Sequence, residues 1–400
     1  MRAAAARRGE SFLDELRLFA EFGAKTGVAV EDDIPYYTNA YWTAGQRRAH
    51  SLHEISYRAC FKPQLPAFFI GRLTQPGETV CDPFMGRGTT ALEAALMGRR
   101  PVGSDANPLS LMLTRPRLRP PTIEDIAARL DAAPWGSGEI ERDDLLAFYH
   151  DETLRQICAL RRYLLARAQA GALDAVDEWI RMVALNRLTG HSPGFFSVYT
   201  MPPNQAVSVK AQLKINARRG QAPPPRDIAA LILKKSRALL AGGAPPLAAE
   251  PRLAVADAAR LDHLEAGCVD LVVTSPPFLD VVDYRADNWL RNWFAGVGQD
   301  RIVLSQLRAP EDWSAMTRGV FEEFARVVRR GGHVVYEVGE VRGGALPLER
   351  LVWRALEGLP FARLGVLVNQ QSFTKTSNCW GVDNNAKGVN SNRAVIARRL

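Results

Sequence analysis

Short β-branched runs alternate with longer amphipathic segments over two separate stretches of the chain. Parallel strands joined by helices produce this pattern. The runs expected to be strands are 79–82, 100–105, 253–257, 269–273, 333–340, 363–369 and 393–400. The helices expected beside them are 61–73, 86–98, 320–332 and 348–359. The sequence therefore predicts an α/β fold built on a doubly wound, Rossmann-like sheet.

The alternation stops between the two stretches. Residues 116–250 carry mainly helical patterns, and proline-rich joints (QAPPPRD, GGAPPLAAEPR) interrupt them. We therefore expect one α/β domain made of residues 54–115 and 251–400, with residues 116–250 as a helical insertion. Residues 1–53 are expected to form an N-terminal arm, in which a helical pattern precedes the aromatic stretch IPYYTNAYW. Hydrophobic docking of that arm is favoured over contact with nucleic acid.

Composition narrows the class of protein. The chain has 400 residues, 47% of them hydrophobic, which is enough for a full core and a sizeable insertion. No apolar run is long enough to span a bilayer, so we expect no membrane contact and a cytoplasmic location. The five cysteines are scattered without a C-x-x-C pair, and the six histidines lack metal-ligand spacing. Neither a disulfide framework nor a bound metal is expected.

The positive charge is concentrated in one segment. The net charge is +8, and residues 201–240 hold eight Lys and Arg against a single acid, Asp227. Three of these cations recur every fourth residue and form one stripe if the stretch is helical. The predicted DNA contacts are Lys210, Lys214, Arg218 and Arg219. Such a stripe is typical of phosphate binding, although a solvated helix face is the alternative.

A glycine-rich turn follows the first strand of the α/β pattern. In DPFMGRGTT, residues 82–90, Gly86 and Gly88 allow the backbone to bend tightly and approach a ligand. The segment is neither G-x-G-x-x-G nor a P-loop, which would need a lysine. Asp105 ends the second strand, where a carboxylate can accept hydrogen bonds from ribose hydroxyls or cap a turn. Asp257 ends the third strand, where it can bind an adenine amino group or cap a helix.

A double-proline corner follows the next strand, in VVTSPPF at residues 272–278. Proline donates no ladder hydrogen bond, so Pro276 and Pro277 must lie beyond the paired part of the strand. The two fixed φ angles make a stiff corner that leaves the carbonyls of Ser275 and Pro276 without regular partners. Such a corner is either a plain loop or a cradle for a flat group that carries an NH2.

Taken together, DPFMGRGTT, SDANP and TSPPF resemble the S-adenosylmethionine-dependent DNA amino-methyltransferases that modify cytosine N4 or adenine N6. The resemblance covers residues 54–115 and 250–400. It implies S-adenosyl-L-methionine as cofactor, bound by Lys62, Pro63, Asp82, Phe84, Gly86, Gly88, Thr89, Thr90, Asp105 and Asp257. It implies a target base held by Ser275, Pro276, Pro277 and Phe278. The glycine turn and the double-proline corner are then expected to face each other across one pocket.

The chemistry of this reaction suits the corner. An exocyclic amine is a poor nucleophile because its lone pair is delocalised into the ring, and two carbonyl acceptors can draw the nitrogen toward tetrahedral geometry. Placement and electrostatics supply most of such catalysis, and no covalent enzyme intermediate is required. Phe278 is expected to stack on a base swung out of the duplex.

Within the family, serine before the prolines favours cytosine N4, whereas Asp or Asn favours adenine N6. We therefore expect a site-specific methyltransferase acting on cytosine N4 in double-stranded DNA. The alternatives are an adenine-N6 DNA methyltransferase, an RNA amino-methyltransferase and a DNA-binding module without turnover. The resemblance also allows a restriction–modification setting with a cognate endonuclease, which the sequence itself does not show. The asparagine-rich loop 370–391 is expected to wall the flipped base, with a disordered surface loop as the alternative.

Overall fold

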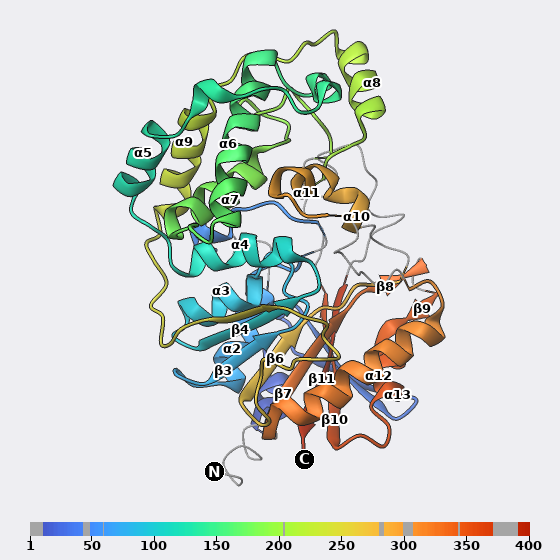
Figure 1. The fold of residues 1–400 in the computed structure, drawn as a ribbon. Coiled ribbons are helices and arrows are strands. Elements are labelled where there is room, and N and C mark those ends of the chain that lie inside the picture. The colour runs from blue at the N-terminus through green and yellow to red at the C-terminus, as the bar shows by residue number, and fades with distance from the viewer. Residues whose placement is uncertain are drawn as a thin grey trace.

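The computed structural model describes residues 11–42, 49–58, 60–202, 205–279, 284–298, 307–342, 345–370 and 391–400. The loop 371–390 therefore lies outside the described residues, and its expected role stays untested. Figure 1 shows two parts, a sheet flanked by helices and a group of helices above one edge of that sheet. The C-terminal end of the chain lies near the opposite edge of the sheet (Figure 1).

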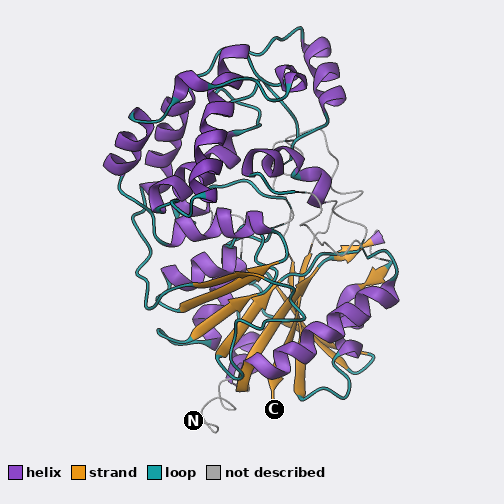
Figure 2. Cartoon of the chain, in the orientation of Figure 1, coloured by secondary structure: helices purple, strands orange, loops and turns teal. Residues whose placement is uncertain are grey.

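A nine-stranded mixed sheet forms the lower part (Figure 2). Its spatial order is β1 (Gly27–Glu31), β2 (Ile34–Asn39), β10 (Phe361–Gln370), β11 (Ser391–Arg399), β7 (Val328–Val338), β6 (Val269–Thr274), β3 (Thr79–Asp82), β4 (Arg100–Asp105) and β5 (Arg252–Val255). Strands β7, β6, β3, β4 and β5 are parallel, and β11 runs antiparallel between β7 and β10. The predicted doubly wound sheet is thus confirmed. The strand order reverses between β3 and β6, and open α/β sheets bind ligands outside the carboxyl ends of strands at such a switch point.

Helices cover both faces of the sheet. On one face, a helix at 11–18, α2 (Gln64–Leu73) and α3 (Thr89–Leu96) pack over Leu271 and Val273. On the other face, α12 (Pro310–Val327) and α13 (Leu348–Ala355) pack over Val272. Neighbouring residues of β6 therefore enter different cores, as the two-residue period of a strand requires. A small hairpin of β8 (Glu340–Val341) and β9 (Leu346–Pro347) lies beyond β7.

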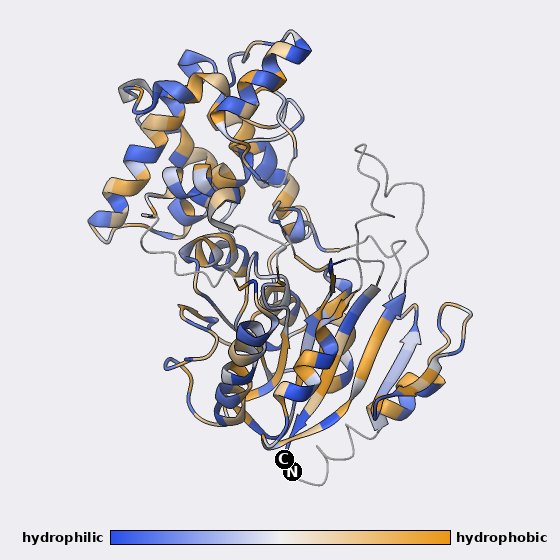
Figure 3. Cartoon of the chain, turned by 90° about the vertical axis from the view of Figure 1, so that its right-hand side faces the viewer, coloured by the Kyte–Doolittle hydropathy of each residue, from blue (hydrophilic) through white to orange (hydrophobic). Residues whose placement is uncertain are grey.

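The upper part is helical, as expected for residues 116–250. Its elements are α4 (Pro108–Leu118), α5 (Ile123–Asp131), α6 (Asp151–Gln169), α7 (Ala175–Arg187), α8 (Val209–Arg219) and α9 (Ile228–Leu240), with 3-10 turns η1 (Ser51–His53), η2 (Trp135–Ser137) and η3 (Asp143–Ala147). Figure 3 shows hydrophobic and hydrophilic positions alternating along these helices. Leu92 and Ala95 of α3 share one buried core with Trp179 of α7, so the helical part is continuous with the α/β part.

Two short helices carry the chain from the double-proline corner into this helical part. They are α10 (Tyr284–Asp287) and α11 (Trp289–Ala295), and Leu290 and Phe294 of α11 enter the core of the insertion. Arg58 forms a 2.8 Å ion pair with Asp287, which ties α10 to the segment before α2. Residues beyond the corner therefore belong to the helical part by packing, although they follow the sheet in sequence.

Three local features differ from the sequence predictions. The N-terminal arm supplies β1 and β2, and β2 pairs in parallel with β10 in the main sheet. Helix α12 begins at Pro310, well before the expected start at 320. It also ends at Val327, and the glycine pair expected to stop it lies inside β7. At Gly332 an added Cβ would lie 2.8 Å from the Asp270 carbonyl oxygen, so this glycine permits close strand approach.

Candidate active site

The two loops singled out in the sequence meet at the carboxyl edge of the sheet. Strands β3 and β6 are adjacent and parallel, so the loops that follow them leave the sheet side by side. The Thr274 hydroxyl donates a 2.6 Å hydrogen bond to Oδ1 of Asp82, and the Thr90 hydroxyl donates a 3.1 Å bond to the Val273 carbonyl. The strand ends that carry the glycine turn and the double-proline corner are therefore neighbours.

The glycine turn owes its shape to two left-handed residues. Gly86 has φ 52° and Gly88 has φ 73°, values that side chains other than glycine rarely adopt. A Cβ on Gly88 would lie 2.3 Å from Oγ1 of Thr114, so the turn also packs directly against α4. The turn delivers the chain into α3, whose first residues Thr89 and Thr90 are both buried.

Asp105 lies at the centre of this turn. Its Oδ2 accepts a 2.8 Å hydrogen bond from the Gly86 N–H, and its Oδ1 accepts a 2.8 Å bond from the Asn107 N–H. Burial raises the pKa of Asp105, while these two backbone donors oppose the rise. A carboxylate offers about four lone-pair sites, so the two hydrogen bonds leave acceptor capacity for ribose hydroxyls. The residues present therefore fit a nucleoside-type cofactor.

Asp82, the first residue of the turn, is fully buried beneath it. Burial raises the pKa of this carboxyl to about 7, although hydrogen bonds from Thr274 and the Phe84 N–H favour the charged form. Asp82 serves as a structural acceptor that joins β3 to β6, while the half-buried Phe84 lies at the edge of the neighbouring core.

The segment before α2 runs alongside the glycine turn. Lys62 is exposed and Pro63 is the N-cap residue of α2. The Arg87 guanidinium donates hydrogen bonds to the Ile55 carbonyl at 2.8 Å and to the Phe61 carbonyl at 3.5 Å. Tyr57 was not singled out from the sequence, yet its ring would lie 3.8 Å from a Cβ on Gly86.

Asp257 closes a turn and caps no helix among the described residues that follow it. Its carboxylate is exposed and accepts a 2.8 Å hydrogen bond from the Ala259 N–H, which closes a tight turn. The Ala256 N–H donates to the Asp105 carbonyl at 3.1 Å, so the end of β5 does lie beside the end of β4. Asp257 is thus near the site, and its Oδ1 already accepts a hydrogen bond from the Ala259 N–H.

The double-proline corner is held by contacts that the sequence did not reveal. The Ser275 side chain forms a hydrogen bond with Glu337 of β7, and Asn392 Nδ2 donates to Glu337 Oε1 at 2.9 Å. Burial raises the pKa of Glu337, which is 4% exposed, and these hydrogen bonds oppose the rise. The available signal was a carboxylate inside the apolar strand HVVYEVGE, because buried acids are rare unless they are partnered.

Phe278, the aromatic residue of the corner, packs against the end of β7. A Cβ on Gly339 would lie 2.7 Å from Cε2 of Phe278, so a glycine is needed for the ring to sit there. The Trp313 indole N–H donates a 2.9 Å hydrogen bond to the Pro277 carbonyl. The corner is therefore anchored to both β7 and α12.

The basic stripe lies on α8, which is helical as predicted. The Ser208 hydroxyl caps its N-terminus, and Lys210, Lys214 and Arg218 are all exposed. The Arg219 guanidinium stacks 3.9 Å above the Tyr199 ring. Figure 1 shows α8 at the outer end of the helical part, apart from the strand ends. The structure therefore does not bring this stripe together with the two loops.

The described part of the chain was expected to lack a membrane-spanning helix and a metal site. Within it, no helix is both long and apolar enough to cross a membrane. The described residues also contain no cluster of three or more His, Cys, Asp or Glu side chains that could hold a metal ion.

A family model and a known protein each match part of the chain. Residues 24–111 match the family model of the DNA methylases, a span that includes β3, the glycine turn and Asp105. The Type II methyltransferase M.MjaII of Methanocaldococcus jannaschii is 31% identical over 80 residues. These two matches support an amino-methyltransferase family for this chain. The matched region is 20% of this chain and 15% of that relative's length. The match also supports S-adenosylmethionine as the cofactor.

Solved structures with similar folds are distant in sequence. TrmN from Thermus thermophilus is 14% identical, with 88% of this chain and 52% of that chain covered and a TM-score of 0.35. A putative DNA modification methylase from the same organism, complexed with S-adenosyl-L-methionine, is 20% identical over 36% of this chain and 54% of its own, with a TM-score of 0.22. Geranyl diphosphate C-methyltransferase from Streptomyces coelicolor A3(2) is 10% identical, with 98% of each chain covered and a TM-score of 0.32.

Proposed function

We propose that this chain transfers the methyl group of S-adenosylmethionine to the exocyclic N4 amine of cytosine in double-stranded DNA. The observation that carries the proposal is the junction between the two loops. Thr274, directly before Ser275, donates a 2.6 Å hydrogen bond to Asp82, the first residue of the glycine turn. A donor held by one loop and an amine held by the other would thus meet at one edge of the sheet.

The glycine turn and Asp105 are the proposed cofactor contacts. Bound S-adenosylmethionine supplies a methyl group on a sulfonium that is already activated for transfer. Gly86 and Gly88 let the backbone approach the cofactor, and Asp105 would accept hydrogen bonds from its ribose. Lys62 and Pro63 flank the turn from the start of α2. Phe84, Thr89 and Thr90 complete the cofactor side of the proposed pocket, and Asp257 stays a proposed contact near the adenine.

The corner is the proposed acceptor site. The carbonyls of Ser275 and Pro276 would accept both N–H bonds of the target amine and localise its lone pair on nitrogen. Phe278 would support the flipped base by stacking, with its ring braced against Gly339. Ser275 before the prolines favours cytosine over adenine, and its bond to Glu337 fixes the hydroxyl beside the base.

The choice of DNA as the substrate polymer rests on the positive charge of α8. The exposed cations of α8 form a stripe that suits the phosphates of a duplex, because Lys and Arg contacts release condensed counterions. The helical insertion would then carry target recognition. A cognate endonuclease and a restriction–modification role stay predictions of the family resemblance.

One experiment tests activity, base and polymer together. The protein is expressed in a host without DNA methylation, and nucleosides from host DNA and RNA are analysed by mass spectrometry. N4-methylcytosine in DNA is expected, and it should be absent with a Ser275→Ala/Pro276→Ala double variant. N6-methyladenine would overturn the choice of base, and methylation confined to RNA would overturn the choice of polymer. Cofactor binding without any methylated product would indicate a DNA-binding module without turnover.

A further inference from the structure

Trp313 links the outer helix layer to the double-proline corner. It lies in the first turn of α12, is 1% exposed, and belongs to the core between α12 and the sheet. Its Nε1–H donates a 2.9 Å hydrogen bond to the Pro277 carbonyl, across 36 positions of sequence. Among the described side chains, it is the one that donates to a carbonyl of residues 275–278. Because the acceptor is a main-chain carbonyl, this hydrogen bond holds the backbone of the corner in place.

The backbone of the corner has little internal freedom. Pro276 and Pro277 both have fixed φ, and neither has an N–H with which to bond the strand beside it. The position of the corner therefore depends on few contacts. The described ones are the Ser275–Glu337 bond, the packing of Phe278 on Gly339, and the Trp313 bond to Pro277. Both prolines have fixed φ, and a residue before a proline is restricted to extended ψ. Holding the Pro277 carbonyl therefore also restricts where the Ser275 and Pro276 carbonyls can lie.

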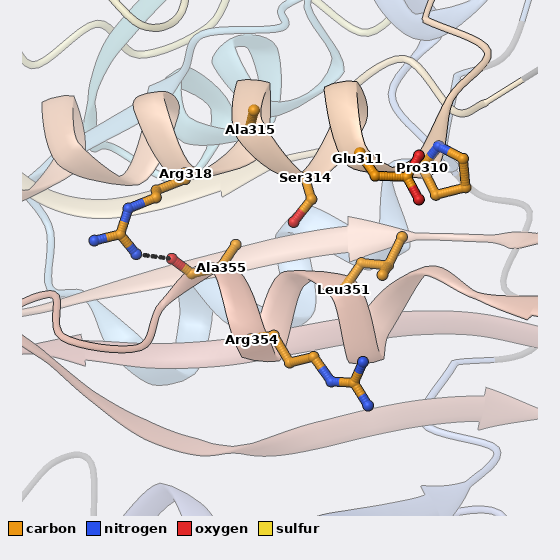
Figure 4. A pocket seen from close by; sticks show the side chains of 8 residues that line it. All are labelled: Pro310, Glu311, Ser314, Ala315, Arg318, Leu351, Arg354 and Ala355. Atoms are coloured by element: carbon orange, nitrogen blue, oxygen red, sulfur yellow. Dashed lines mark hydrogen bonds between the residues drawn. The ribbon is translucent and has the colours of Figure 1, made fainter.

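The two faces of α12 have different surroundings. A groove of about 410 Å³ between α12 and α13 is lined by Ser314 and Arg318 of α12 and by Leu351 and Arg354 of α13. Figure 4 shows these side chains. Arg318 bridges the helices through a 3.2 Å hydrogen bond from Nη1 to the Ala355 carbonyl. Trp313 instead lies on the buried face. The groove residues therefore provide controls on the same helix that do not contact the corner.

We propose that Trp313 is a positioning residue, which sets the height and orientation of the acceptor carbonyls through its bond to Pro277. The inference rests on the proposed function, since it assigns Trp313 to the acceptor side of that same site. Loss of the indole N–H should slow methyl transfer with little effect on the binding of cofactor or DNA. A misplacement of about 1 Å can cost roughly a hundredfold in rate, so a drop of about ten- to a hundredfold in kcat is expected.

The test compares Trp313→Phe with a matched variant, Trp179→Phe. Trp179 is also fully buried, and its Nε1–H also donates a 2.9 Å hydrogen bond, in this case to Ser236 in the helical part. Both changes remove an indole N–H and leave an aromatic ring. Ser314→Ala controls for changes in α12 itself. Incorporation of 3-benzothienylalanine at position 313 removes the N–H while keeping the full ring shape, which covers the case that Trp313→Phe does not fold.

Three readings are taken for each variant: kcat and KM with saturating cofactor, the Kd for S-adenosylmethionine, and amide hydrogen exchange at Phe278 and Leu279. Trp313→Phe should lower kcat and leave KM and the Kd for S-adenosylmethionine unchanged. Amide exchange should become about tenfold faster, as expected for one lost hydrogen bond. Trp179→Phe and Ser314→Ala should change none of these. Unchanged kcat and exchange in both position-313 variants would overturn the inference. If the wild-type protein methylates nothing, the proposed function fails, and exchange alone still decides whether Trp313 anchors the corner.

Discussion

The backbone N–H of Gly86 donates a 2.8 Å hydrogen bond to Oδ2 of Asp105, the residue that ends the neighbouring strand. This contact joins the glycine turn to the end of β4. Gly86 and Asp105, both predicted cofactor contacts, are thus linked by one hydrogen bond. Because Gly86 has φ 52°, the N–H reaches Asp105 only in a backbone conformation that favours glycine. The conformation of the turn and the orientation of the carboxylate are therefore coupled.

Gly86→Val should abolish cofactor binding. Valine at positive φ is strained by about 1–3 kcal/mol, and relief of that strain would move the N–H away from Asp105. Gly98→Val is the matched control, because Gly98 has φ 71° at the other end of α3 and a Cβ added there would meet no atom within 4 Å. Calorimetric titration with S-adenosylmethionine and thermal unfolding are measured on both. Equal loss of affinity in the two variants would show that strain alone is responsible.

Ser275→Ala and Pro276→Ala should each lower turnover strongly while leaving cofactor binding nearly intact. The first change removes the hydrogen bond to Glu337, and the second frees a φ angle that keeps the corner stiff. We expect a fall in kcat of at least about a hundredfold for either variant, since acceptor geometry is lost. Radiolabelled methyl transfer to DNA gives kcat, and titration gives the Kd of the cofactor. Full methylation by both variants would remove the corner from the mechanism.

A Lys210→Ala/Lys214→Ala/Arg218→Ala variant should bind DNA more weakly and with less dependence on salt. Each lost phosphate contact should reduce the slope of log K against log salt by about 1. The control is Lys234→Ala/Arg237→Ala, which removes two exposed cations from α9 in the same basic segment. Fluorescence anisotropy over a salt series measures both slopes. An unchanged slope in the α8 variant would make that stripe a solvated surface.

The stability of the protein should fall as pH rises toward neutrality because of Asp82. Its pKa is raised by burial from 3.8 to about 7 in the folded chain, so the folded state holds a proton that the unfolded state has released over that interval. The stabilisation that Asp82 contributes is complete below the pKa of its carboxyl in the unfolded state. It is lost as pH rises through the pKa of the same group in the folded state. The loss is at most roughly 4 kcal/mol.

Asp82→Asn keeps an acceptor for Thr274 and removes the titration. Denaturant unfolding is measured from about pH 4 to 8, and the wild-type protein should lose stability relative to Asp82→Asn as pH rises. Asp262→Asn, whose side chain is 70% exposed, controls for the loss of a carboxylate. Parallel curves for wild type and Asp82→Asn would show that the Asp82 proton does not contribute to stability.

The sequence alone predicted the strands of the two α/β stretches, the glycine turn, the corner and the stripe of positive charge, because these depend on local properties. Strand periodicity, the φ restrictions of glycine and proline and the four-residue spacing of charges are all present within short windows. The family resemblance led us to expect the glycine turn and the corner to face each other across one pocket, and the structure places their strands β3 and β6 side by side. The membership of residues 27–39 in the main sheet was not predictable, because strand pairing depends on a partner more than 300 residues away.

The tertiary structure alone decided which residues hold the site. Glu337, Trp313 and Gly339 come from elements far along the chain, and each contributes one contact to the corner. No local pattern specifies these contacts, since they arise only when α12 and β7 pack beside β6. Residue type and spacing thus specified the chemistry available to this protein, while packing set the positions of the groups that would carry it out.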